Sequence, residues 1–182
     1  MYNNTMYELG SQPSLIRELF AYGLEQAKIV GSENVFDYTL GNPSIPAPAK
    51  VQQAIKDILD DTDSIKIHGY SMAGGFDETR EAIAANLNKR FGTDIKASNL
   101  FVTCGAAPAL ISVIKALAAD ADSEIMAVAP FFPEYRPFVE KNGAHLVVVP
   151  ADREHFQIDM TKVEELISVH TQAIIINSPN NP

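Results

Sequence analysis

Cysteine, tryptophan and long apolar runs are scarce in this sequence. The 182 residues contain no tryptophan and one cysteine, Cys104, which cannot form a disulfide within the chain. Because Cys104 lies in an apolar run, the sequence predicts a small core side chain in a reducing compartment. No run approaches the roughly 18 apolar residues of a membrane span, and residues 1–6 lack the basic start and apolar segment of a signal peptide. We therefore expect a cytoplasmic protein without a membrane partner.

Basic residues are also few, with 14 Lys and Arg against 23 Asp and Glu and a formal net charge of -9. This balance argues against nucleic acid as a partner, because phosphates are gathered by a basic field. An anion site must instead be built locally, from backbone N–H groups or a helix N-terminus. The four histidines have no metal-ligand spacing, and no Ser-His-Asp or Cys-His set can be assembled. The sequence predicts neither a metal site nor hydrolytic chemistry.

Apolar runs alternate with amphipathic segments from residue 100 onward. The runs predict strands over 100–104, 125–129, 146–149 and 173–176. The intervening segments predict helices over 106–119 and 134–142, and a third that starts at a Thr161–Glu164 capping box and ends near 169. The apolar runs do not alternate with polar residues, which is typical of a mostly parallel sheet covered by helices on both faces. We therefore expect an α/β protein with three αβα layers.

The first hundred residues predict mostly helices. Helical spacing of apolar residues indicates one helix from about residue 14 to Gly31, a second around 51–59 and a third over 82–91. A short strand is expected over 35–40 and a loop over 64–75. Three prolines between residues 43 and 48 exclude regular hydrogen bonding, so this stretch should be an extended connector.

Three motifs follow predicted strands that would end at the same edge of the sheet. Gly105, Ala106 and Ala107 stand at a strand-to-helix turn, where exposed N–H groups could receive a phosphate. Phe131 and Phe132 lie in the next loop, where one ring could stack on a flat cofactor. The segment 177–182, Asn-Ser-Pro-Asn-Asn-Pro, brings side-chain amides to the end of the last strand. Each motif alone also fits an ordinary turn or a core aromatic pair.

The order and spacing of these motifs from about Val35 to Pro182 resemble the pyridoxal-phosphate-dependent aminotransferases of class I/II. This family has the fold-type-I, aspartate-aminotransferase-like architecture. The resemblance implies pyridoxal 5'-phosphate as cofactor, with Gly105, Ala106 and Ala107 around its phosphate and Phe132 stacked on its pyridine ring. It also implies that Asn181 binds the phenolic oxygen of the cofactor and orients the substrate carboxylate.

Two further positions match the family through their neighbours. Tyr70 precedes Gly74, Gly75 and Arg80 and resembles the tyrosine that reaches the cofactor phosphate of the neighbouring subunit. Gly41 resembles the glycine whose backbone lines the substrate carboxylate pocket. The resemblance thus implies a homodimeric enzyme whose substrates are an amino acid and a 2-oxo acid.

The family pattern also predicts what this chain lacks. The Schiff-base lysine and several other catalytic positions follow the Asn-Pro motif in the family, and none of the nine lysines here matches them. We therefore expect a truncated sequence that is inactive alone, with no catalytic residue of its own. Residues 1–46 should form an N-terminal arm and small-domain segment, and 47–182 the first part of the cofactor-binding large domain. A lyase on the same fold and a non-catalytic binding or dimerisation module remain alternatives.

Overall fold

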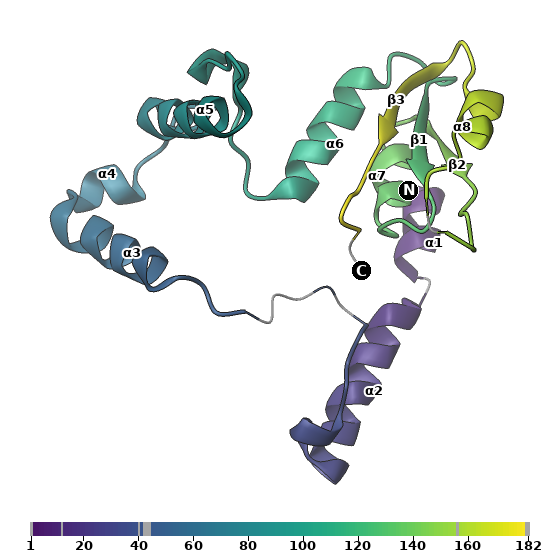
Figure 1. The fold of residues 1–182 in the computed structure, drawn as a ribbon, viewed down its shortest axis with the longest axis horizontal. Helices are drawn as coiled ribbons and strands as arrows, with labels where there is room; N and C mark the ends of the chain where they lie inside the picture. Colours follow the sequence, from purple (N-terminus) through teal and green to yellow (C-terminus); the bar gives the residue numbers. More distant parts are fainter. Residues whose placement is uncertain (1, 12, 40, 42–44, 156, 181–182) are drawn as a thin grey trace. The chain divides into compact units, whose positions relative to one another are not determined.

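The computed structural model describes residues 2–11, 13–39, 41, 45–155 and 157–180. Helices and strands alternate after residue 105, as expected for an α/β chain (Figure 1). The elements are α1 (Asn4–Ser11), α2 (Leu15–Val30), η1 (Ser32–Asn34), α3 (Ala49–Asp61), α4 (Ser64–His68), α5 (Asp77–Phe91), η2 (Ala97–Asn99), α6 (Ala106–Leu117), β1 (Glu124–Val128), α7 (Tyr135–Glu140), β2 (His145–Val149), α8 (Met160–Leu166) and β3 (Thr171–Ile175).

Contacts between residues divide the chain into two compact units. The first comprises residues 1–42 and 110–182, and the second comprises residues 43–109. The first unit contains the sheet, whereas the second contains α3, α4, α5 and η2. The domain boundary expected at residue 46 stays a prediction.

The sheet of the first unit has three parallel strands in the order β2-β1-β3. The central strand β1 is paired on both edges, and Ile125, Met126 and Ala127 are at most 1% exposed. Pairing of β1 with β3 is irregular next to Glu124. There, the Glu124 carboxylate accepts hydrogen bonds from the hydroxyls of Ser168 (2.6 Å) and Thr171 (3.2 Å).

Helices cover both faces of this sheet. On one face, Ile114 of α6 and Val139 of α7 pack against Ile125. On the other face, Val163 of α8 packs against Met126 and Val149. Successive residues of β1 thus enter opposite cores, as the two-residue period of a strand requires. The three αβα layers predicted from the sequence are confirmed in this part of the chain, although the sheet is small.

Two predicted strands are absent from the described residues. Residues 35–39 follow η1 without a strand, and residues 100–104 pair with no strand of the sheet. In the second segment, the Val102 N–H instead donates to the Gly74 carbonyl at 3.0 Å. Cys104 is consequently exposed and is not a core residue. An apolar run predicts burial, but a strand also needs a partner, and the run does not specify one.

Two local predictions also differ from the structure. The stretch expected as a loop over 64–75 contains α4, because the Asp63 carboxylate caps its first turn by accepting from the Ile65 N–H. The cap of α8 is Asp159, whose side chain accepts from the N–H groups of Thr161 and Lys162, so the expected capping box at Thr161 is wrong. Both corrections involve aspartate, a strong N-cap residue.

Candidate functional site

A pocket of about 280 Å³ lies at the carboxyl ends of the three parallel strands. The end of β1 and the loop after each strand line it: Val128 in β1, Ala129 and Pro130 after β1, Asp152, Gln157 and Ile158 after β2, and Ile176, Asn177, Ser178 and Asn180 after β3. The carboxyl ends of parallel strands are where open α/β sheets bind ligands. All of these residues belong to the first unit, so the pocket is formed within one body.

Side-chain amides connect the loop after β3 to the loop after β1. The Asn177 side-chain N–H donates to Asn180 Oδ1 at 2.9 Å. The Asn180 side-chain N–H in turn donates to the Pro130 carbonyl at 2.7 Å. Residues 50 positions apart in the sequence are thus joined at the rim of the pocket.

Two phenylalanines and a buried tyrosine form the loop that continues from Pro130. The Phe131 ring stacks on Tyr135 with 6.2 Å between centroids, and the Phe132 ring meets Tyr135 edge-on at 5.7 Å. Tyr135 is 7% exposed, whereas both phenylalanines are half-buried. Because Tyr135 is fixed in the first turn of α7, it gives both rings a rigid support.

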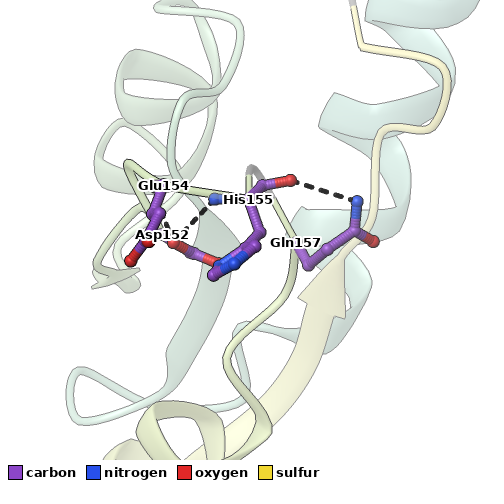
Figure 2. Close-up of polar contacts among 4 residues, drawn as sticks. All are labelled: Asp152, Glu154, His155 and Gln157. Atoms are coloured by element: carbon purple, nitrogen blue, oxygen red, sulfur yellow. Dashed lines mark hydrogen bonds and ion pairs between the residues drawn. The ribbon is translucent and has the colours of Figure 1, made fainter.

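Asp152 organises the loop after β2, as Figure 2 shows. Its Oδ1 accepts from the backbone N–H groups of Glu154 (2.9 Å) and His155 (3.1 Å). Its other oxygen lies 3.3 Å from His155 Nδ1, and the Gln157 side chain donates to the His155 carbonyl at 3.3 Å. These contacts form a turn over residues 152–155 beside the pocket and connect Gln157 to it.

Backbone hydrogen bonds lower the pKa of Asp152 from its usual value of 3.8, the bond from the His155 N–H having the largest effect. The carboxylate is therefore ionised at neutral pH and adds one negative charge to the pocket wall. The other polar groups contributed by the pocket's named side chains are amides and a hydroxyl, which can donate or accept hydrogen bonds. Such a set suits a ligand with several hydrogen-bonding groups beside a flat apolar part.

Of the predicted site residues, the structure places Phe132 in the loop that adjoins the pocket. Phe132 follows the pocket residue Pro130, and Asn181 lies outside the described residues. Gly41 is described and exposed. The positions predicted for the phosphate, Gly105, Ala106, Ala107 and Tyr70, lie in the second unit. The convergence of both groups on one ligand stays a prediction.

The residues predicted to bind the phosphate can be described within their own unit. Gly105 has φ +109°, and a Cβ at this position would meet no atom within 4 Å. Ala106 and Ala107 are exposed in the first turn of α6, at a helix N-terminus. Tyr70 is fully exposed in the loop after α4. An open glycine turn before a helix can receive an anion.

Sequence reasoning missed the contribution of the loop after β2. Asp152 and Gln157 line the pocket, but neither belongs to a recognisable motif. The available signal was positional, because the carboxyl end of β2 must lie at the same edge as those of β1 and β3. Among the described residues, no group of three or more His, Cys, Asp or Glu side chains could hold a metal ion. No described helix combines the length and apolar character needed to cross a membrane.

Similar proteins identify the family. Residues 32–182 match the family described as aminotransferase class I and II. The chain is 33% identical over 171 residues to a probable aspartate aminotransferase of Methanocaldococcus jannaschii, covering 94% of this chain and 42% of that protein. It is also 33% identical over 158 residues to the aspartate aminotransferase of Thermotoga maritima, covering 86% and 41% respectively.

A crystal structure of an aminotransferase from Eubacterium rectale is similar in fold, with a TM-score of 0.94 and 54% identity. It is matched over 100% of this chain and 46% of that one. The chain therefore spans less than half the length of these relatives. By its sequence and its fold, this chain belongs to the aminotransferase class I and II family.

Proposed function

We propose that the protein containing this chain is a pyridoxal-phosphate-dependent aminotransferase. Its substrates are an amino acid and a 2-oxo acid, between which it transfers an amino group. The main support is the match of residues 32–182 to the aminotransferase family. The pocket at the strand ends, with amides on its rim and aromatic rings in the adjoining loop, agrees with that function.

The residues of this chain fit the cofactor in chemical character. Phe132 offers a half-buried aromatic face beside the strand ends, and the turn at Gly105 is open to an anion. In the proposal, Phe132 stacks on the pyridine ring, while the N–H groups of Gly105, Ala106 and Ala107 bind the phosphate. Bound pyridoxal phosphate supplies the electron sink for amino-group transfer.

Other residues of the chain orient the reactants. Asn181 donates a hydrogen bond to the phenolic oxygen of the cofactor and helps to hold the substrate carboxylate, whose pocket Gly41 lines. Tyr70 donates to the cofactor phosphate bound by a second subunit. Its complete exposure is what a side chain that reaches another subunit requires. The proposal thus includes a homodimer with shared active sites, located in the cytoplasm.

The decisive experiment uses the full-length protein and two matched variants. Equilibrium dialysis measures pyridoxal phosphate binding, and transfer of a labelled amino group from acidic and aromatic amino acids to 2-oxo acids measures activity. Phe132→Leu should weaken cofactor binding about tenfold, because the stacked ring is lost. Phe36→Leu changes a ring that is 77% exposed and should leave binding unchanged. If the wild-type protein neither binds the cofactor nor transfers the amino group, the proposal is wrong.

The 182-residue chain by itself should not transaminate, because none of its lysines matches the family's catalytic lysine. Mixing the purified chain with pyridoxal phosphate, an amino acid and a 2-oxo acid acceptor tests this expectation. Formation of the 2-oxo acid product at the rate of a full-length enzyme would contradict it.

A further inference from the structure

The side-chain amide of Asn180 is hydrogen-bonded to the loop that carries Phe132. Pro130 begins the segment that carries Phe132, and its carbonyl is bound by Asn180 at 2.7 Å. At the other end, the Tyr135 N–H donates to the Phe132 carbonyl at 3.0 Å. The segment between Pro130 and Tyr135 is therefore held from both sides, by the loop after β3 and by α7.

The structure assigns Asn180 as a positioning residue: by holding the Pro130 carbonyl, it sets the position of the aromatic loop and hence the face that Phe132 presents to the cofactor. This inference rests on the proposed function and adds a residue to it. Asn180 itself does not have to touch the cofactor. It acts through Pro130, whereas Phe132 makes the contact.

The connection needs an amide at position 180, because its two ends have different partners. Asn180 Oδ1 accepts from Asn177, and the opposite end donates to Pro130. An aspartate at 180 could still accept from Asn177 but would place a second acceptor against the carbonyl. An aspartate at 177 cannot donate to Asn180 Oδ1, and it favours the flipped Asn180 amide, whose N–H groups face 177. In the flipped amide Asn180 Oδ1 faces the Pro130 carbonyl, which weakens the same bond.

Because two prolines restrict the aromatic loop, one hydrogen bond is enough to set its position. Pro130 and Pro133 fix two φ angles of the aromatic loop, so few conformations remain for the connection to select among. The bonds of Asn180 are exposed to solvent, where a hydrogen bond adds only a modest net free energy. Its loss should therefore change the position of the loop more than the global stability of the protein.

The experiment compares Asn180→Asp and Asn177→Asp with the matched variant Asn142→Asp in the full-length protein. Asn142 also donates a side-chain hydrogen bond to a backbone carbonyl, that of Phe138 at 2.8 Å. It precedes β2, so it lies away from the carboxyl ends of the strands. Three properties are measured. They are the dissociation constant for pyridoxal phosphate, the visible circular dichroism of the bound cofactor, and hydrogen exchange of the 130–135 peptide without cofactor.

Asn180→Asp and Asn177→Asp should each weaken cofactor binding about fivefold, alter the circular dichroism, and speed exchange in the 130–135 peptide. Asn142→Asp should leave all three properties unchanged. Hydrogen exchange can be measured in each variant separately. The inference is therefore still tested if one of Asn180→Asp and Asn177→Asp fails to fold.

The outcomes separate this inference from the proposed function. If the wild-type protein binds no pyridoxal phosphate, the proposed function is wrong, and with it the role assigned to Asn180. If the wild-type protein binds the cofactor, but Asn180→Asp and Asn177→Asp have the same circular dichroism and exchange rates as the wild type, only the role of Asn180 is overturned. If Asn180→Asp and Asn177→Asp weaken cofactor binding but leave the circular dichroism and the exchange of the 130–135 peptide as in the wild type, the positioning role is likewise overturned.

Discussion

A single carboxylate shapes one wall of the candidate pocket. Asp152 binds two backbone N–H groups and the imidazole of His155, so the turn over 152–155 depends on its charge. The hydrogen bonds lower the pKa of Asp152 in the folded protein. The ionised carboxylate therefore stabilises the turn above the usual value of 3.8, and this contribution is lost as the pH falls through the lower folded pKa.

Protonation of Asp152 should accordingly require more acid in the folded protein than in the unfolded chain. Carbon-13 labelling of aspartate in the full-length protein allows the carboxyl signal to be titrated with and without urea. The signal that disappears in Asp152→Asn identifies the residue. A midpoint that is equal in the two conditions would contradict the assigned hydrogen bonds.

At the residue scale, the sequence predicted groups that follow a recognisable pattern. Phe132 and the Asn/Pro segment after β3 could be placed at the strand ends from apolar runs and the geometry of parallel sheets. Asp152 could not, because its role depends on the turn that residues 152–155 form. The partner of Asn180 was equally hidden, since Pro130 precedes it by 50 positions.

Among the elements, β1 holds the first unit together. It is the only described strand with neighbours on both edges, and its side chains enter both helix-covered cores. Met126 is completely buried between β1 and α8, against Val149 and Val163. A smaller side chain here would leave a cavity between β1 and α8.

Met126→Ala should lower the free energy of unfolding by about 3 kcal/mol, from lost apolar burial and the cavity that remains. Met160→Ala removes the same atoms from a side chain that is 59% exposed and should change it by less than about 0.5 kcal/mol. Urea denaturation of the two full-length variants measures the difference. Equal effects would show that the core assigned to β1 and α8 is wrong.

The strands of this unit were predictable and those outside it were not. Apolar, mostly β-branched runs marked β1, β2 and β3 to within about two residues, because these strands pair with each other inside the chain. The runs over 35–40 and 100–104 have similar composition but no strand partner among the described residues. Strand formation depends on a distant neighbour, which local composition does not encode.

At the scale of the whole molecule, many large apolar side chains of the described residues are exposed to solvent. In α3 alone, Val51, Ile55, Ile58 and Leu59 are each 47–57% exposed. They share one face of the helix, because they recur at spacings of three and four residues. A contiguous apolar face of this kind is typical of a surface that another element or chain covers.

The 182-residue chain should therefore self-associate when it is purified alone. Sedimentation velocity should show species larger than a monomer, and Ile55→Glu with Leu59→Glu should reduce them. Gln52→Glu adds a like charge at a position of α3 that is already polar and should have less effect. A monodisperse monomer at the highest soluble concentration would contradict the prediction.

The strand order also affects the sequence of folding events. Only α7 separates β1 from β2, whereas β3 arrives after α8 as well. Closing a shorter loop costs less chain entropy, so the β1–β2 pair should form first and β3 should join a preformed template. The hydrogen bond from the Ser168 hydroxyl to the Glu124 carboxylate would then form only in the last stage, after β3 has paired with β1. Pulse-labelled hydrogen exchange during refolding of the full-length protein would reveal the opposite order if β3 amides became protected before those of β2.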